Sequence, residues 1–363
     1  MYEYYILSVL FTFLIVVFFI SKFAIMDCNF TLFIYDLLTP KKDAYYNDSV
    51  VWIIGNSGGI SEQIACHLAK YKAHRLILSA DHAKSLTFIK EKCLEINKSW
   101  NEFSILILPF DLTVTSTHAT VVRTAMQWAN NKIHVVIYNA GRCERAVWYD
   151  IEPETDIHCF KVNALGQTNI ARHILRHLEK SASTETKNIS LPIRFIVVSS
   201  LAGIMGISPP FTASYNAAKL ALTVNANVKI LKCKITIFKL PVCQRQGYFR
   251  SLQGEFSECG DIKVVICCLN LLHPLENSTK AFTDTKASNQ VPMTSLPVLT
   301  HGEEHMQKIS WRLSAERCSE LILLAGSKAV SECWIERQQA IFYLTACCPP
   351  LARWIIREQL KNR

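Results

Sequence analysis

The sequence lacks the cysteine spacings that zinc sites and small disulfide-bonded domains use. Its 14 cysteines include no Cys-x-x-Cys motif. The adjacent pairs Cys267-Cys268 and Cys347-Cys348 suit neither metal ligation nor a disulfide framework. We therefore expect buried free thiols in a reducing compartment, and we predict no metal site.

Charged residues are also scarce, at 19% of the 363 residues. Tyr4–Ile20 carries no charge, and the apolar run continues to Met26 with Lys22 as its one charged residue. A run of this length can cross a bilayer as a helix. A cleaved signal peptide is the alternative, but no basic stretch precedes the run and no small-residue cleavage site follows it. We predict an uncleaved membrane anchor over 1–26, followed by a juxtamembrane linker over 27–47.

A nucleic-acid-binding face is not predicted, although the formal net charge is +9. The excess is local, because Thr223–Gln246 contributes five Lys or Arg residues and no acid. Near the anchor, Glu3 precedes the apolar run and Lys41 and Lys42 follow it, which favours a cytoplasmic body by the positive-inside bias. The expected location is a membrane crossed once, that of the endoplasmic reticulum.

Beyond the linker, short apolar runs alternate with helical stretches in units of about thirty residues. Predicted strands lie at 50–54, 75–78, 103–108, 134–138, 195–200 and 263–267, and predicted helices lie at 62–71, 84–97, 118–130 and 154–178. This alternation is typical of a parallel sheet with helices on both faces. We therefore predict the α/β class, with a Rossmann-like, doubly wound parallel sheet over 48–340 behind an N-terminal transmembrane helix.

A glycine-rich turn joins the first predicted strand to the first predicted helix. It reads Gly55-Asn56-Ser57-Gly58-Gly59-Ile60-Ser61. In this position, backbone N–H groups and a helix N-terminus can bind a pyrophosphate. Ligands of such sheets lie at the carboxyl ends of the strands. The polar and glycine residues predicted at those ends are Gly55, Asp81, Asp111, Asn139 and Ser200.

Tyr215 and Lys219 lie four positions apart, and Tyr215 lies fifteen residues after Ser200. On a helix this spacing places both on one face. An ammonium ~4 Å away is worth at most ~4 kcal/mol at an effective dielectric of ~20. That interaction lowers a phenol pKa by up to roughly three units, so Tyr215 is predicted to act as a general acid or base. Chance is the alternative, because 12 tyrosines and many lysines produce this spacing easily.

Together these motifs resemble the short-chain dehydrogenases/reductases (SDR), and within them the membrane-anchored dehydrogenase/reductase family member 7 group, near 11β-hydroxysteroid dehydrogenases. The resemblance covers about residues 48–222 and 247–363. It rests on the glycine turn, Asp111-Leu112-Thr113, Asn139-Ala140-Gly141, Asn163, Ser200 and Tyr215-x-x-x-Lys219. It implies an oxidoreductase that moves a hydride between NAD or NADP and an alcohol or ketone.

The resemblance also implies roles for single residues. Tyr215 would be the general acid or base, and Ser200 would polarise the carbonyl. Lys219 would lower the pKa of the tyrosine and hold the nicotinamide ribose. Asn163 would position a water in the proton relay, although a helical Asn is more often a local backbone partner. The implied cofactor-binding residues are Gly55, Ser57, Gly59, Ile60, Asp81, Asp111, Leu112, Asn139, Ala140, Gly141, Tyr215 and Lys219.

The sequence departs from the family pattern at several site positions. Ser61 stands where the third glycine of the turn is usual, so we expect looser packing and weaker cofactor binding. Asp81 stands where relatives that prefer NADP carry arginine, and its carboxylate would repel a 2′-phosphate, so NAD is predicted over NADP. The loop before the tyrosine is about two residues longer and contains Pro209-Pro210. Leu269-Asn270 replaces the usual Pro-Gly.

A basic, β-prone stretch over 223–246 interrupts the pattern just after Lys219, and the pattern resumes at Gly247. It has the character of an insertion. In the family, the helix that carries the lysine packs against a dimer partner. We therefore expect the stretch to bulge out or to split this helix, and to weaken dimerisation or activity. The family resemblance implies a homodimer, which the stretch 223–246 would weaken.

Two later segments bear on the substrate. Residues 274–310 are rich in Ser, Thr, Asn and Pro, which predicts a long substrate loop, with a disordered surface segment as the alternative. Residues 341–363 alternate apolar and basic residues, so this tail is predicted to be amphipathic and to lie on the membrane or on the domain. The anchor and the apolar composition favour a lipophilic substrate such as a steroid, a retinoid or a lipid carbonyl. The alternative function is a catalytically impaired binding or scaffold protein at the membrane.

Overall fold

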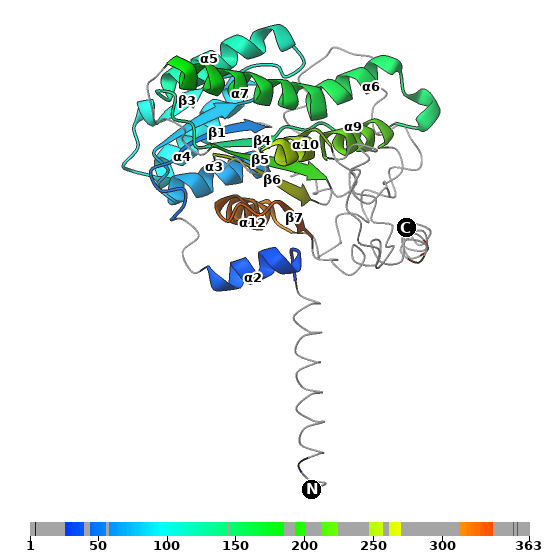
Figure 1. Ribbon diagram of the computed structural model, residues 1–363, viewed down its shortest axis with the longest axis horizontal. Coiled ribbons are helices and arrows are strands. Elements are labelled where there is room, and N and C mark those ends of the chain that lie inside the picture. Colours follow the sequence, from blue (N-terminus) through cyan, green and yellow to red (C-terminus); the bar gives the residue numbers. More distant parts are fainter. Residues whose placement is uncertain are drawn as a thin grey trace.

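The computed structural model describes residues 26–39, 44–55, 58–143, 146–184, 193–200, 212–223, 247–256, 261–269 and 313–336, with the single residues Tyr4, Leu351 and Trp354. Over these ranges the chain forms a seven-stranded parallel sheet covered by helices on both faces, which confirms the α/β prediction (Figure 1). No helix within the same ranges is both long and apolar enough to span a membrane. Apart from those single residues, the predicted anchor, the stretch 224–246, the loop 274–310 and the tail 341–363 lie outside the described residues.

The strands are short, buried, apolar runs, as expected of strands that are covered on both faces. They are β1 (Val50–Gly55), β2 (Arg75–Ser79), β3 (Ile105–Ile107), β4 (Val135–Asn139), β5 (Ile193–Ser200), β6 (Ile262–Leu269) and β7 (Glu332–Ile335). Their order across the sheet is β3-β2-β1-β4-β5-β6-β7. The order reverses between β1 and β4, and ligands of such sheets bind in the crevice beyond the strand ends at this point.

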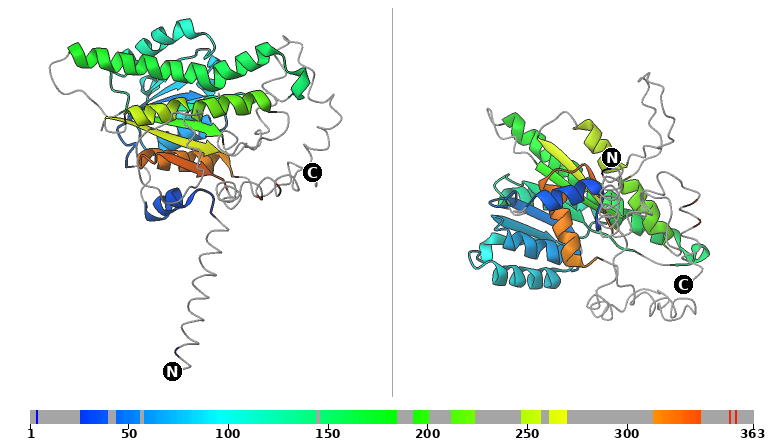
Figure 2. Two further views of the ribbon diagram at one scale, coloured as in Figure 1. Left: turned by 45° about the vertical axis from the view of Figure 1, so that its right-hand side comes forward. Right: turned by 90° about the horizontal axis from the view of Figure 1, so that it is seen from below.

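Alternate side chains of each strand enter two separate cores. Val51 and Ile53 of β1 belong to the core under one set of helices, whereas Trp52 and Ile54 belong to the opposite core. The first set is α3 (Ile60–Lys70), α4 (Ala83–Ile96) and α12 (Ala315–Ser327), and the second is α5 (His118–Trp128), α7 (Gly166–Thr184), α9 (Ala213–Thr223) and α10 (Tyr248–Glu255). Figures 1 and 2 show these layers.

The predicted elements differ from the observed ones in two places. The expected strand 103–108 begins as a 3-10 turn, η1 (Glu102–Ser104), so β3 has three residues only. The expected helix 154–178 is α6 (Pro153–Phe160), a π-helical turn over Lys161–Leu165 and α7. Two further 3-10 turns are Thr115–Thr117 and Trp148–Asp150.

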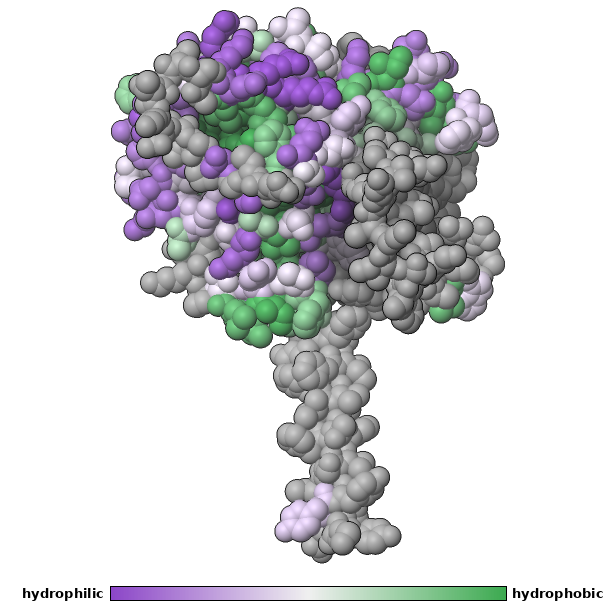
Figure 3. Space-filling view, viewed as in Figure 1, coloured by the Kyte–Doolittle hydropathy of each residue, from purple (hydrophilic) through white to green (hydrophobic). Residues whose placement is uncertain are grey.

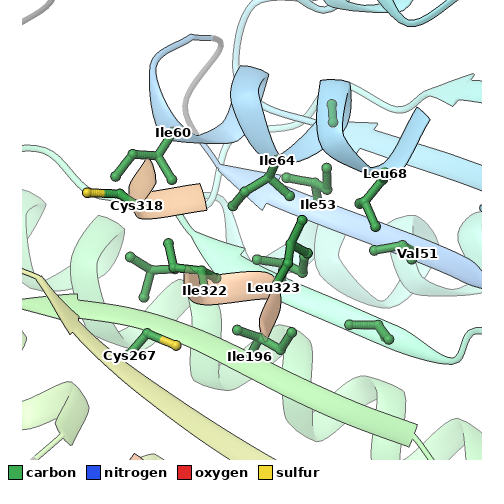
Figure 4. Close-up of a cluster of buried hydrophobic side chains, with 14 of the residues drawn as sticks. Val51, Ile53, Ile60, Ile64, Leu68, Ile196, Cys267, Cys318, Ile322 and Leu323 are labelled. Atoms are coloured by element: carbon green, nitrogen blue, oxygen red, sulfur yellow. The ribbon is translucent and has the colours of Figure 1, made fainter. Parts of the chain in front are cut away.

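Helix α12 lies close to the sheet because Gly326 faces it. A Cβ atom at Gly326 would lie 2.3 Å from Ile196 Cδ1 and 2.5 Å from the Tyr46 hydroxyl oxygen, so only glycine allows this approach. The buried Tyr46 hydroxyl donates to the Leu323 carbonyl at 2.8 Å. Figure 4 shows the apolar cluster that results, in which Leu323 and its α12 neighbours lie between α3 and the sheet.

The cysteines of the described chain are free thiols, as expected. Cys143 is partly exposed, and the eight buried ones are Cys28, Cys66, Cys93, Cys159, Cys267, Cys268, Cys318 and Cys333. Within the same part of the chain, no group of three or more His, Cys, Asp or Glu side chains is arranged to hold a metal ion. The thiols therefore act as small apolar side chains of the cores.

The stretch predicted as a linker contains structure that the sequence analysis missed. Cys28 forms an antiparallel bridge with Ile335, the last residue of β7. The Asn29 N–H donates to the Trp334 carbonyl at 2.9 Å, so the chain lies against the free edge of β7. Helix α2 (Phe30–Leu38) follows directly and packs on α12.

Candidate active site

A cleft lies at the carboxyl ends of the first four strands, where the strand order reverses. It is lined by Ile54, Gly55, Ser79, Ala80, Asp81, Phe110, Asp111, Leu112, Ala140 and Val162. Five of these residues belong to the predicted cofactor set, although they are separated by up to 85 positions in the chain. The parallel topology is what brings them together.

The glycine turn, described except for residues 56 and 57, leads into the N-terminus of α3. Gly59 is the N-cap residue of α3, and its φ of 62° lies in the left-handed region that favours glycine. Ile60 is the first residue of α3, so the helix N-terminus opens at the turn. Gly55 ends β1 at the edge of the cleft. Ser57, also predicted to bind the cofactor, lies outside the described residues.

Ser61 occupies space that Gly55 leaves open. A Cβ atom at Gly55 would lie 2.3 Å from Ser61 Oγ. The Ser61 hydroxyl is buried and accepts a hydrogen bond of 2.7 Å from Asn139 Nδ2 at the end of β4. The serine thus joins α3 to the fourth strand, so the structure gives no support to the looser packing expected from the missing glycine.

The two acids of the cleft have different surroundings. Asp81 follows β2 with 64% of its side chain exposed, and its Oδ2 lies 3.6 Å from His82 Nε2. Asp111 Oδ1 instead accepts a hydrogen bond of 2.7 Å from the Thr113 N–H. The Asp81 carboxylate is therefore the more available of the two for a ligand that enters the cleft.

The four predicted catalytic residues meet beside this cleft. Ser200 is the last residue of β5, and its hydroxyl is hydrogen-bonded to the Tyr215 phenol. Tyr215 lies in the first turn of α9, and Lys219 Nζ lies 5.9 Å from the centroid of its ring. A Cβ atom at Gly141 would lie 3.2 Å from Lys219 Nζ and 3.1 Å from Asn163 Oδ1. Gly141 thus leaves the space through which the lysine and the asparagine reach the site.

The Lys219 ammonium is buried and bonded to backbone carbonyl groups. It donates to the carbonyl oxygens of Ala140 and Val198, at 3.2 Å and 3.3 Å. Only 3% of the residue is exposed. Burial lowers its pKa to about 8, against a smaller opposing effect of nearby thiols, of which Cys159 is the strongest. An ammonium with this pKa gains or loses its proton near physiological pH.

The Tyr215 pKa differs in sign from the prediction. Burial raises it above the ordinary value, Cys143 adds to the rise, and the hydrogen bond with Ser200 lowers it in part. The prediction considered only the charge of Lys219. Desolvation of the buried phenol favours its neutral form and has the larger effect. The expectation that Lys219 brings this pKa down was therefore wrong for the site as the structure describes it.

Asn163 holds the segment after β4 in place. It lies in the π-helical turn, fully buried. Its Nδ2 donates to the carbonyls of Arg142 and Cys159, both at 2.9 Å, and its Oδ1 accepts from the Arg142 N–H at 3.1 Å. Such turns are frequent at functional sites. The structure thus shows Asn163 as a backbone partner, the role that its residue type suggests.

Two residues of the site were missed by the sequence analysis. Gln167, four positions after Asn163, is fully buried and donates to the Ala140 carbonyl at 2.8 Å, the same oxygen that receives Lys219. Gly166 allows α7 to approach the cleft, because a Cβ atom there would lie 2.5 Å from the Leu112 carbonyl oxygen. The helical spacing from Asn163 was the available signal for Gln167.

Comparisons with known proteins agree with this geometry. The family model described as short chain dehydrogenase matches residues 49–232, slightly more than half of the chain. Dehydrogenase/reductase SDR family member 7 of Homo sapiens is 26% identical over 318 residues, covering 87% of this chain and 79% of that protein. Hydroxysteroid 11-beta-dehydrogenase 1-like protein of Gallus gallus is 27% identical over 224 residues, covering 61% of this chain and 63% of that protein.

A solved structure shows the same fold. A short chain dehydrogenase/reductase from Burkholderia phymatum, in complex with NAD, has a TM-score of 0.59 at 15% identity, covering 83% of this chain and 92% of that one. At this identity the likeness concerns the fold alone. With the family match and the arrangement of site residues, the conclusion is that the chain belongs to the short-chain dehydrogenase/reductase family of oxidoreductases, built on an NAD(P)-binding fold.

Proposed function

We propose that the protein transfers a hydride between a nicotinamide dinucleotide and the alcohol or ketone of a lipophilic small molecule, such as a steroid, a retinoid or a lipid carbonyl. One observation carries this proposal. The Ser200 hydroxyl, the Tyr215 phenol and the Lys219 ammonium gather at the ends of β4 and β5, next to the cleft that begins at the glycine turn. A proton donor and a dinucleotide cleft thus lie side by side.

The cleft offers a suitable group for each part of a dinucleotide. The N–H groups of the glycine turn and the N-terminus of α3 would take the pyrophosphate. Asp81 would accept hydrogen bonds from the adenosine ribose. Gly141 lacks the Cβ atom that would crowd Lys219, which leaves the ammonium within reach of a ligand at this position. When bound, the cofactor supplies or accepts the hydride.

Tyr215 is the residue that donates the proton in carbonyl reduction. Because burial raises the pKa of its phenol, the group is protonated at neutral pH and can donate its proton to a substrate carbonyl oxygen. The Ser200 hydroxyl is placed to donate a hydrogen bond to the same oxygen. This protonation state favours carbonyl reduction at neutral pH over alcohol oxidation, which requires the phenolate.

The test is turnover of a panel of lipophilic ketones with NADH or NADPH, on the full chain. We expect Tyr215→Phe to lower turnover by about 10²- to 10⁴-fold, the usual contribution of a general acid. Tyr71→Phe, at the C-terminal end of α3, is the matched control and should leave turnover unchanged. Cofactor binding by the unmodified chain without turnover of any ketone would favour the scaffold function. Turnover that survives Tyr215→Phe would remove the phenol from the mechanism.

We further propose NAD as the preferred cofactor. The exposed Asp81 carboxylate at the adenosine end of the cleft would repel the 2′-phosphate of NADP and can hydrogen-bond a free 2′-hydroxyl. Dissociation constants measured by tryptophan fluorescence should show tighter binding of NADH than of NADPH. Asp81→Asn removes the charge at constant shape and should reduce this preference. Tighter NADPH binding by the unmodified chain would contradict the proposal.

The proposal places the enzyme at a membrane, with residues 1–26 as a single-pass anchor of the endoplasmic reticulum. Its support is the uncharged run Tyr4–Ile20 and the likeness to proteins named hydroxysteroid dehydrogenase-like, whose name points to a lipophilic substrate. Resistance of the chain to extraction from membranes by alkaline carbonate tests the anchor. Light scattering with and without residues 224–246 tests the proposed homodimer, which a shortened chain should form more readily.

A further inference from the structure

Helix α2 has an apolar face that no described residue covers. Its sequence, Phe30-Thr-Leu-Phe-Ile-Tyr-Asp-Leu-Leu38, contains a single charged residue. Leu32 is fully buried, and Phe33 packs on the core next to it. On a helix with 3.6 residues per turn, Phe30, Ile34, Leu37 and Leu38 share the opposite face.

This outer face is well exposed. The exposed fractions are 55% for Phe30, 71% for Leu37 and 69% for Leu38. Tyr35 borders the face, with 37% of its surface exposed and Lys328 Nζ 6.0 Å from its ring. Figure 3 shows these side chains as an apolar patch over α2, at the edge of the molecule where Figure 1 places this helix. Single exposed apolar residues are ordinary, whereas a contiguous patch indicates a contact surface.

The one charge of the helix is turned away from this face. Asp36 Oδ2 accepts a hydrogen bond of 2.7 Å from Arg317 Nη2 of α12, and Arg317 Nε donates to Asp27 Oδ2, also at 2.7 Å. Glu320 completes the cluster at 3.2 Å from Arg317 Nη1. The cluster fixes α2 on α12 and leaves no charged side chain among the outer residues of the helix.

The chain before α2 determines what can lie against it. Residues 27–29 are fixed to β7, so the chain reaches α2 at a defined point of the domain. The uncharged run Tyr4–Ile20 ends six positions before Met26. Six extended residues span at most about 20 Å, so a membrane that holds this run as its anchor lies within that distance of Met26, four residues before α2 begins.

We propose that the outer face of α2 lies on the phospholipid bilayer, with Phe30, Leu37 and Leu38 in the boundary between headgroups and acyl chains. The inference rests on the proposed anchor, which brings the bilayer to the helix. A helix that lies on a membrane surface binds this boundary through the apolar area of one face, with cationic side chains beside the headgroups. Lys328 at the border of the face supplies this charge.

The proposal has a consequence for the enzyme. Since α2 is fixed to α12, and α12 packs on the sheet, contact of the helix with lipid would hold the whole domain at one angle to the membrane. A linker over residues 27–47 without these contacts would instead let the domain rotate freely. A fixed angle gives the site a constant position relative to a lipophilic substrate dissolved in the bilayer.

The test is photochemical labelling of the full chain in phosphatidylcholine vesicles. The lipid carries a diazirine high on one acyl chain, and labelled peptides are mapped by mass spectrometry. We expect label on both 4–20 and 30–38. The double substitution Leu37→Asp/Leu38→Asp should lower the label on 30–38 at least tenfold and leave that on 4–20 in place. Phe88→Asp/Phe103→Asp, at two other exposed positions, is the matched control and should change neither.

Each other outcome overturns the inference in a recognisable way. Label on 4–20 without label on 30–38 keeps the anchor and removes the lipid contact of α2. Absence of label from both segments removes the anchor as well. Label on 30–38 that persists in the Asp double variant shows that the outer face does not make the contact. A dimer in detergent that the same variant dissociates assigns the face to a second copy of the chain.

Discussion

Two cations of this molecule, the buried Lys219 and the half-buried Arg317, have opposite surroundings. Lys219 lies at the active site among carbonyl oxygens and thiols, and burial lowers its pKa to about 8. Burial also lowers the pKa of Arg317, but its hydrogen bonds with Asp27 and Asp36 outweigh this effect and raise the pKa. Lys219 donates to two backbone carbonyl oxygens, whereas Arg317 is paired with three carboxylates.

The difference separates a functional charge from a structural one. An ion that is compensated by carboxylates fixes two helices and keeps its charge at every physiological pH. An ion that is buried among neutral dipoles is costly to keep charged, so its pKa is shifted. Such groups are common at active sites, where the shifted pKa serves ligand binding or the reaction. The predictions below test this contrast in order of expected effect.

Replacing the active-site cation should abolish most of the activity. For Lys219→Met we expect a loss of turnover of about 10²-fold or more, the lower part of the range for acid–base assistance. We expect little loss of stability, because a buried charge is replaced by an apolar side chain of similar size. Turnover with NADH and urea unfolding measure the two effects. Full turnover in the variant would show that the ammonium takes no part.

The same lysine should give activity and stability opposite dependences on pH. Above about pH 8 the folded chain loses the Lys219 proton, so turnover that needs the ammonium should fall about tenfold per pH unit. An unfolded lysine keeps its proton to about pH 10.4. Between these values the unfolded chain binds more protons, so this lysine makes the free energy of unfolding rise with pH by about 1.4 kcal/mol per unit.

Other titratable groups also change turnover and stability with pH. Subtracting the pH profiles of Lys219→Met from those of the unmodified chain leaves the contribution of Lys219. The difference in stability between the two chains should change between pH 8 and 10 and stay constant between pH 6 and 7. A difference that is flat over the whole range would show that Lys219 has an ordinary pKa in the folded protein.

Removing the compensated cation should affect stability and spare the chemistry. Arg317→Met removes the cation that Asp27 and Asp36 share, and we expect a loss of roughly 2–3 kcal/mol in urea unfolding. Removing one partner of a fully buried ion pair costs about 3–5 kcal/mol. We expect less here because 27% of the arginine side chain is exposed. Turnover per folded molecule should remain within about twofold. The milder change Asp36→Asn, which retains a hydrogen-bond acceptor, should cost about 1 kcal/mol.

The smallest effect on cofactor binding is expected at the phosphate turn. Ser61→Gly removes the acceptor of the Asn139 hydrogen bond, which should lower the free energy of unfolding by about 1 kcal/mol. Glycine in a helix should lower it by about another 1 kcal/mol. Affinity for NADH should change less than tenfold, because the helix N-terminus is retained. Markedly tighter NADH binding by the variant would restore the view that serine weakens this site.

Sequence patterns predicted most of the sheet because parallel strands are continuous apolar runs with polar or glycine residues at their ends. The same reasoning missed α2, whose apolar residues surround the helix and therefore show no amphipathic period. It also missed β7, because four residues are too few for a pattern. Both elements depend on contacts between segments about three hundred positions apart, such as Asp27 with Arg317.

The residues of the site were predicted well, whereas the direction of the Tyr215 pKa shift was not. Tyr215 and Lys219 lie on one helix as their spacing indicated, and Ser200 and Asn163 lie beside them as the strand end and the family resemblance implied. The sign of the Tyr215 pKa was wrong because desolvation depends on the packing around a group, which no local pattern reports. Gln167 was missed because its role is to share one carbonyl oxygen with Lys219, a contact that exists only after β4 and α7 come together.

The contact of residues 27–29 with β7 sets a limit on how this protein can be shortened for study. These residues cover the outer edge of the last strand, and an uncovered strand edge is a template for pairing with another chain. A soluble version made by deleting the apolar N-terminus should therefore begin no later than Met26. Deletion as far as Ser49, the residue before β1, would remove the strand cover, α2 and the partners of Arg317 together, and such a chain should aggregate through β7.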